Sequence, residues 1–279
     1  MAAFQKRLIF LFVLSLLLIS TFPTFSADTI KTTNIETLSF KQEITIPIDT
    51  SSPAADYQPI DTRITFDQSC WAENETIHSI RVAYDDGDGL EEIESQIYDL
   101  SHTDETHIDS CSLVFLIPKD STGKERYYVL YDDQQTDTVT YEDHISIMDT
   151  HYYYEPISGQ IMDFDYYRIT QDEYIVYALC QKGELLGNGM SNAIIKLLPN
   201  STEFTTTNAE QIASFYMSYS TDPSGTHDGS QWAKDIKKTV LVDGNLMTRI
   251  QIEGTSPKED IKTNNIYSYY YCPSSAKHI

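Results

Sequence analysis

The sequence predicts an all-β protein of antiparallel β-sandwich architecture, arranged as two packed β-domains. Short segments alternate apolar and polar residues along most of the chain, which is the pattern of half-buried strands. Clusters of turn residues separate these segments at intervals of roughly 8–15 residues, a spacing typical of sandwiches and barrels. The chain also has 20 tyrosines, many of them in strand-like segments, and tyrosine favours strands because its ring packs while its hydroxyl stays hydrated.

Four strands are predicted in the first half. The segments 44–48 and 80–84 carry apolar residues at alternate positions. The segment 113–117 (LVFLI) is continuously apolar and predicts a central strand that is buried on both faces. The tyrosine-rich segment 127–131 follows after the turn residues 121–124, so the last two strands are expected to form a hairpin.

The second half continues the same pattern. Strands are predicted at 174–180 and 184–186, on either side of Gln181-Lys182-Gly183. The segments 239–242 and 246–252 flank Asp243-Gly244-Asn245, and a turn rich in Asp, Gly and Asn between apolar runs is the strongest short-range signal of a hairpin.

The chain divides into four predicted parts. Residues 1–26 form a signal peptide, and residues 27–60 form a lead-in segment with one strand. Residues 61–150 form the first β-domain, and residues 151–279 form the second β-sandwich-like domain. Only residues 209–219 fit a helix as well as a strand.

The first 26 residues have the three parts of a secretory signal. Lys6 and Arg7 precede an apolar run at 8–19, and Pro23 and the residues 24–26 follow it. The alternative is a retained anchor, but the apolar stretch is shorter than the ~20 residues of a spanning helix. We therefore expect a secreted or cell-surface protein with no membrane span after cleavage.

The charge of the chain argues against two classes of partner. The net charge is −23, and removal of the signal takes it to −25 because both charges there are positive. Such a surface repels phosphate groups, so the sequence argues against binding to nucleic acid or anionic membranes.

The four cysteines all lie in the exported part of the chain. Two disulfides are compatible with an extracellular location, and four cysteines allow three pairings. The alternative is a set of buried thiols, and the spacings are too wide for a compact zinc site. The disulfide candidates are Cys70, Cys111, Cys180 and Cys272.

The densest acidic segment, residues 85–92, is a candidate calcium site. Carboxylate oxygens at alternate positions with intervening glycines suit a hard cation, and Asp86 and Asp88 are the candidate ligands. The segment lacks the complete spacing of an EF-hand, and the alternative is a solvated turn between two strands. Calcium is the one cofactor that the sequence suggests.

No sequence motif identifies a catalytic group. The chain lacks a G-x-S-x-G elbow, a P-loop and an H-E-x-x-H signature. Glycosidase carboxylates cannot be selected among 42 acidic residues, because their required separation is spatial. Catalytic and carbohydrate-binding residues therefore stay unassigned, and whether the chain is an enzyme stays open.

Several short segments resemble the small β-domain that precedes a large β-supersandwich, related to galactose-mutarotase domains, in secreted polysaccharide lyases and α-mannosidase-like proteins. These segments are, in order, 71–74, 79–82, 94–97, 113–116 and 127–131, followed by 174–187 and 249–254. The resemblance implies a carbohydrate-related activity. It also implies an incomplete or minimal supersandwich, since the second half offers too few strands, and no catalytic residue carries over.

Three functions follow from these observations. The first is a secreted carbohydrate-binding or carbohydrate-processing accessory module with a polysaccharide or glycoconjugate partner. The second is a structural or adhesive cell-surface protein that binds partners through strand edges. The third is a polysaccharide lyase or glycosidase, which would have a cleft that gathers Tyr or His with Arg or Lys.

Overall fold

The computed structural model describes residues 35–182, 184–185, 188–189, 193–205, 207–214, 219–222, 225–227, 234–255 and 262–273. The predicted all-β class is confirmed, since these residues form antiparallel strands, one 3-10 turn, η1 (Ile35–Thr37), and no α-helix. The predicted signal peptide lies outside the described residues. The segment that fitted a helix as well as a strand contains strand β14 (Ala209–Ser214).

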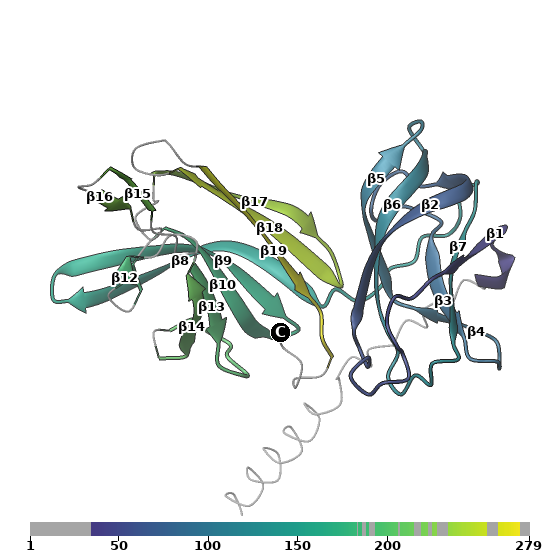
Figure 1. The fold of residues 1–279 in the computed structure, drawn as a ribbon, viewed down its shortest axis with the longest axis horizontal. Coiled ribbons are helices and arrows are strands. Elements are labelled where there is room, and N and C mark those ends of the chain that lie inside the picture. The colour runs from purple at the N-terminus through teal and green to yellow at the C-terminus, as the bar shows by residue number, and fades with distance from the viewer. Residues whose placement is uncertain are drawn as a thin grey trace, which may run out of the picture. The chain divides into compact units, whose positions relative to one another are not determined.

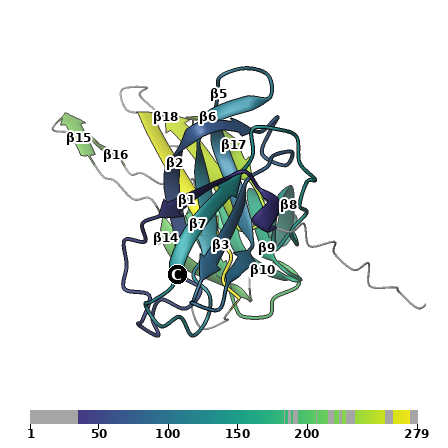
Figure 2. The ribbon, with the colours of Figure 1, turned by 90° about the vertical axis from the view of Figure 1, so that its right-hand side faces the viewer.

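Two sheets form the first sandwich (Figure 1). The four-stranded sheet has the order β1 (Phe40–Ile44), β7 (Arg126–Tyr131), β3 (Arg81–Asp85) and β4 (Leu90–Ile93). The three-stranded sheet has the order β2 (Pro59–Trp71), β6 (His107–Leu116) and β5 (Ser95–His102). Figure 2 shows β1, β7 and β3 side by side, in agreement with their hydrogen-bonded register.

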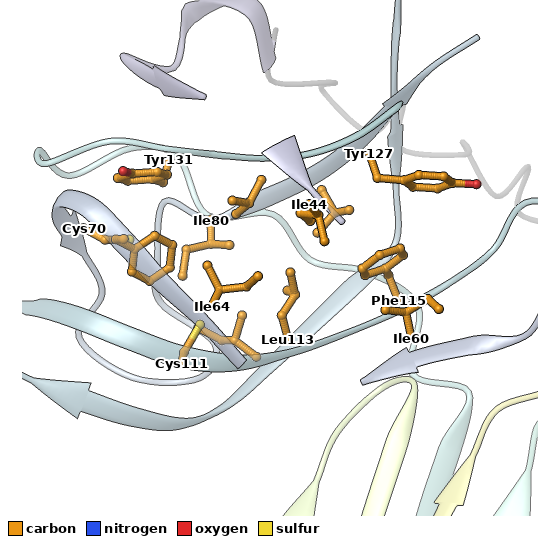
Figure 3. Close-up of a cluster of buried hydrophobic side chains, with 14 of the residues drawn as sticks. Ile44, Ile60, Ile64, Cys70, Ile80, Cys111, Leu113, Phe115, Tyr127 and Tyr131 are labelled. Carbon is orange, nitrogen blue, oxygen red and sulfur yellow. The ribbon is translucent and has the colours of Figure 1, made fainter. Parts of the chain in front are cut away.

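One hydrophobic core joins these two sheets. Ile60, Ile64, Leu113 and Phe115 extend from the three-stranded sheet, and the other sheet contributes alternate residues of β7, such as Tyr127. Figure 3 shows these side chains pointing toward one another between the two layers. The alternation of apolar residues predicted from the sequence is therefore what places one face of each sheet in the core.

The prediction of a hairpin is wrong for the segments 113–117 and 127–131. β6 pairs with β2 and β5, whereas β7 pairs with β1 and β3, so the two strands lie in different sheets. The rings of Phe115 and Tyr127 stack across the core with centroids 5.8 Å apart. The strand predicted at 44–48 is also shifted, because β1 ends at Ile44.

The second sandwich pairs a five-stranded sheet with a three-stranded one. The larger sheet has the order β14, β13 (Ala193–Leu197), β10 (Tyr174–Lys182), β9 (Gln160–Gln171) and β8 (Ile145–Ile157). The smaller sheet has the order β17 (Lys234–Asp243), β18 (Met247–Thr255) and β19 (Lys262–Tyr270). Two short hairpins complete the strands: β11 (Glu184–Leu185) with β12 (Asn188–Gly189), and β15 (Tyr219–Asp222) with β16 (Gly225–His227).

The core of the second sandwich is rich in tyrosine. Tyr167, Tyr177 and Tyr269 pack with Ile250 and Ile252 between the two sheets. The hairpin predicted around Asp243-Gly244-Asn245 is confirmed, since β17 and β18 pair in antiparallel register from Asp243 opposite Thr248. The predicted division at 150/151 lies inside β8.

A third apolar cluster lies where β5 and β6 meet the β17–β18 hairpin. It contains Tyr98 and Val114 from the first sandwich and Leu246 and Met247 from the second. Val114 points away from the core that its neighbours Leu113 and Phe115 enter. The predicted central strand is therefore confirmed as buried on both faces, which explains its continuous apolar run.

Candidate functional site

A cleft of about 910 Å³ lies beside this third cluster. Its walls come from β5, from the segment that leads into β8, and from the β17–β18 turn. Its lining includes Gln96, Tyr98, Tyr141, Asp143, Asp243, Asn245 and Arg249. Since a concave site with a few convergent polar groups is the usual form of a ligand site, this cleft is the candidate functional site.

Gln96 fixes the turn that forms one wall of the cleft. The side chain is 6% exposed, and its Oε1 atom accepts hydrogen bonds from the backbone N–H groups of Leu246 (2.9 Å) and Met247 (2.7 Å). Its Nε2 atom donates to the carbonyl of Met247 at 3.0 Å. All of these polar groups are buried, so losing one partner leaves an unsatisfied group at a cost of about 1–3 kcal/mol.

His144 brings a second chain segment to the same turn. Its backbone N–H donates to the carbonyl of Asn245 at 3.3 Å. Its ring stacks on Tyr271 with centroids 4.0 Å apart, and its nitrogens lie 3.0 Å from Glu94 Oε2 and 3.4 Å from Asp172 Oδ1. These contacts hold the neighbouring Asp143 beside Asp243, one hundred positions away in the sequence.

Asp143 and Asp243 form a carboxylate pair on the cleft wall. Burial, and then the negative charge of Asp143, raise the pKa of Asp243 above its usual range. Neither carboxylate has a hydrogen bond or ion pair within the described ranges. The pair can therefore accept hydrogen bonds or positive charge from a ligand.

Asn245 also lines this wall. Its Nδ2 atom is shielded from solvent and has no hydrogen-bond partner among the residues that the structure describes. A buried amide without a partner is unfavourable and rare in folded proteins. Because this atom is shielded, a ligand in the cleft does not reach it in this arrangement.

Arg249 is the cationic side chain at the cleft, and it already has partners. Its Nη2 atom lies 3.2 Å from Asp61 Oδ2 and 3.1 Å from the hydroxyl of Tyr98. Asp61 also accepts hydrogen bonds from the hydroxyls of Tyr98 (2.7 Å) and Tyr270 (2.6 Å). This network joins the two sandwiches, and the guanidinium is largely neutralised by Asp61.

Tyr141 of the cleft lining contacts a buried charged group. Arg81 is 1% exposed, and its guanidinium donates to the backbone carbonyls of Ile80 and Asp137. Glu92 Oε1 lies 3.6 Å from Arg81 Nε and accepts a 2.7 Å hydrogen bond from the hydroxyl of Tyr141. Burial, and then the charge of Glu92, raise the pKa of Tyr141, so the phenol stays protonated.

His78 is neutral at the cleft wall. Burial, and then the nearby charge of Arg81, lower the pKa of His78 to about 4. Its Nδ1 atom accepts a hydrogen bond from the backbone N–H of Ile80 at 3.2 Å. The cleft thus gathers Tyr, His and Arg, as expected for a lyase, but the histidine is uncharged and the arginine is paired.

The predicted calcium ligands lie elsewhere, in the exposed turn between β3 and β4. The backbone N–H of Asp88 donates to Asp86 Oδ1, and that of Gly87 donates to Asp85 Oδ1, as in a solvated turn. Across the described segments, no group of three or more His, Cys, Asp or Glu side chains is arranged to hold a metal ion. The calcium site stays a prediction.

Two of the disulfide candidates are free thiols in the first core. Cys70 and Cys111 are buried, but Cys70 lies opposite Ile108 and Cys111 opposite Ile64 in the β2–β6 register. Three residues of β6 separate these rungs, about 10 Å, which exceeds the reach of a disulfide. Burial raises the pKa of both thiols, that of Cys70 to about 12.

The other two candidates lie in the second sandwich. Cys272 is buried, and its backbone N–H and carbonyl bind the side chain of Gln171. The backbone of Cys180 lies opposite Tyr166 on β9, and its side chain is outside the described residues.

Most residues of the cleft could not be recognised from the sequence. Asp243-Gly244-Asn245 predicted a turn, but nothing in the sequence pairs it with Asp143. The tyrosine clusters did not indicate Tyr98 or Tyr141, because both are isolated from them. A sequence pattern does not show which carboxylates the fold brings together from distant positions, and this proximity is what identifies the site.

Comparison of the chain with known protein families, with curated proteins and with solved structures finds no match. Among the described residues, no helix has the length and apolar character needed to cross a membrane.

Proposed function

We propose that the protein is a secreted carbohydrate-binding module and that the cleft is its binding site. The observation that carries this proposal is that the free carboxylates of Asp143 and Asp243 line one cleft together with Tyr98 and Tyr141. Sugar hydroxyls donate hydrogen bonds that these carboxylates can accept, and the apolar faces of a sugar ring can pack on tyrosine.

The shape and composition of the cleft support the same proposal. Its volume accommodates several sugar rings, and Tyr98 and Tyr141 line it beside the polar groups. Polar groups that a ligand must satisfy give specificity, because an analogue without the matching hydroxyl leaves them unpaired.

A panel of immobilised neutral, amino and acidic polysaccharides tests this proposal. We expect retention on at least one polysaccharide, and at least tenfold weaker binding for the Asn245→Ala variant, which removes a side chain that lines the cleft. The variant Asp86→Asn is the control, since it removes a carboxylate from the distant β3–β4 turn. Binding to no polysaccharide, or equal binding by Asn245→Ala, contradicts the proposal.

The export of the protein is part of this proposal. It rests on the signal-like segment 1–26 and on the acidic charge of the remaining chain. Sequencing of the N-terminus of the protein recovered from the medium or cell surface tests it, with cleavage after about residue 26 expected. An intact N-terminus on protein retained inside the cell contradicts it.

One observation favours a structural or adhesive role as the second candidate. Leu241 on β17 and Ile266 on β19 are 45% and 56% exposed, and both strands are edges of their sheet within the described ranges. A partner strand could add to such an edge. Loss of partner binding in a Leu241→Lys or Ile266→Lys variant, with no saccharide bound by the wild type, would favour this role.

The lyase alternative has less support from the cleft. A lyase that acts on uronates needs a cation to neutralise the substrate carboxylate, and Arg249 is already paired with Asp61. The resemblance to the supersandwich proteins stays a prediction that fits the carbohydrate proposal.

A further inference from the structure

Two Asn-X-Thr sequences have no role in the fold or the cleft described above: Asn74-Glu75-Thr76 and Asn200-Ser201-Thr202. An Asn-X-Ser/Thr sequence without proline at X is the acceptor for an asparagine-linked glycan in an exported protein. The glycan is bulky and hydrated, so an acceptor has to lie at the surface. The structure places the first sequence between β2 and β3 and the second between β13 and β14.

The side chain of Asn74 is bound through its oxygen alone. Oδ1 accepts hydrogen bonds from the backbone N–H groups of Thr76 and Ile77, both at 2.9 Å, and from the hydroxyl of Thr76 at 2.8 Å. Nδ2 donates to no described residue, and it is not one of the polar atoms that burial leaves without a partner, so it faces solvent. The nitrogen that would receive a glycan is therefore accessible, while the oxygen holds the turn.

We propose that Asn74 carries an asparagine-linked glycan in the exported protein. This inference rests on the export that is part of the proposed function. The co-reactant is an oligosaccharide linked through a diphosphate to a lipid. Nδ2 forms a bond to C1 of the first sugar while the bond from C1 to the diphosphate oxygen breaks. The amide proton passes to a base of the transferase, and the lipid diphosphate leaves.

The turn can hold its conformation with the glycan attached. The modified side chain is still an amide that keeps Oδ1, so its three hydrogen bonds from Thr76 and Ile77 persist. The side chains of Glu75 and Thr76 are exposed, which leaves the modified turn in water. These two residues also line the candidate cleft, so the glycan would begin beside its rim.

Peptide mass spectrometry tests this inference on protein recovered from the medium or surface of the cells that naturally produce it. We expect the peptide that contains Asn74 to carry the added mass of an oligosaccharide. Asn200, which is exposed in its own turn, is the internal comparison. A glycan on Asn200 with an unmodified Asn74, or two unmodified asparagines in exported protein, overturns the inference.

Two variants produced in the same cells locate the attachment. Asn74→Asp keeps an oxygen for the three hydrogen bonds of the turn but has no amide nitrogen, so the mass of one glycan should be lost while the fold stays intact. Thr76→Ser is the matched control, because it keeps both the hydroxyl and the acceptor sequence, and it should keep the glycan. An unchanged mass in Asn74→Asp contradicts attachment at this residue.

The outcomes separate this inference from the proposed function. Sequencing of the N-terminus of the same sample shows whether the signal segment was removed. Cleaved protein without a glycan on Asn74 overturns the inference and leaves export and carbohydrate binding intact. Protein that is retained inside the cell with an intact N-terminus overturns export, and the inference fails with it.

Discussion

The side-chain amide of Gln96 occupies the space that a Cβ atom on Gly244 would need. Gln96 lies on β5 of the first sandwich, and Gly244 lies in the turn between β17 and β18 of the second. The close approach lets the amide bind the backbone of Leu246 and Met247. A glycine is required there because of a contact with a residue almost 150 positions away.

The variant Gly244→Ala should destabilise the protein by about 1–3 kcal/mol, because the new methyl group displaces the Gln96 amide and leaves buried backbone groups unsatisfied. Urea denaturation measures this loss. In a Gln96→Ala background, the same substitution should have much less effect, since the colliding amide is absent. Equal losses in the two backgrounds would show that the two residues do not interact.

The variant Tyr270→Phe should lower the free energy of unfolding by about 1–2 kcal/mol, because it removes a 2.6 Å hydrogen bond to the carboxylate of Asp61. Tyr267→Phe on the same strand is the matched control. The Tyr267 hydroxyl has no hydrogen bond within the described part of the chain, so its removal should change stability little. Comparable losses for both variants would contradict a role for the Asp61 network.

Acid should destabilise the protein through His78. The imidazole titrates at 6.5 in an unfolded chain, but burial lowers its pKa to about 4 in the fold. Below 6.5 the unfolded state therefore binds a proton that the folded state does not, and stability falls as the pH drops toward 4. We expect a contribution on the order of 2 kcal/mol across this range.

The variant His78→Asn checks this origin, because the amide oxygen can accept the hydrogen bond of the Ile80 N–H without titrating. Its unfolding free energy should fall less steeply between those pH values than that of the wild type. Parallel pH profiles would assign the acid sensitivity to the carboxylates instead.

Alkaline pH should destabilise the protein through its tyrosines. Burial is the main cause that raises the pKa of both Tyr270 and Tyr271 to about 12, from 10.0 in an unfolded chain. Above pH 10 the unfolded state loses phenolic protons that the folded state retains, so stability falls as the pH rises toward 12. Phenolate absorbance should rise together with unfolding, and ionisation of most tyrosines in a folded protein at pH 10 would contradict this expectation.

Cys70 and Cys111 should resist alkylation in the folded protein and react fully in urea. Both thiols are buried in the first core with raised pKa values, so little reactive thiolate is present. Peptide mapping by mass spectrometry locates the modified residues. Protection that persists in urea without reductant would show that these cysteines form disulfides.

Local sequence patterns predicted the strands but not their partners. The turn Asp243-Gly244-Asn245 identified the β17–β18 hairpin because a tight turn fixes the pairing of adjacent strands. The same reasoning failed for β6 and β7, whose connection crosses from one sheet to the other. Alternation determines which side chains are buried, but it does not determine which sheet a strand joins.

The candidate site shows the same limit. Asp86 and Asp88 were predicted as calcium ligands because they lie at alternate positions of one acidic segment, yet they lie in an exposed turn. Asp143 and Asp243 are single acidic residues among many, and only the fold brings them together.

The sequence by itself determined the all-β class, the acidic surface and the continuous burial of the LVFLI strand, because these depend on composition and on local periodicity. The tertiary structure alone decided the pairing of β6 and β7 with other strands, the contact between Gln96 and Gly244, and the cleft. These depend on the closure of long loops, and the free energy that fixes them comes from packing and hydrogen bonds between residues distant in the chain.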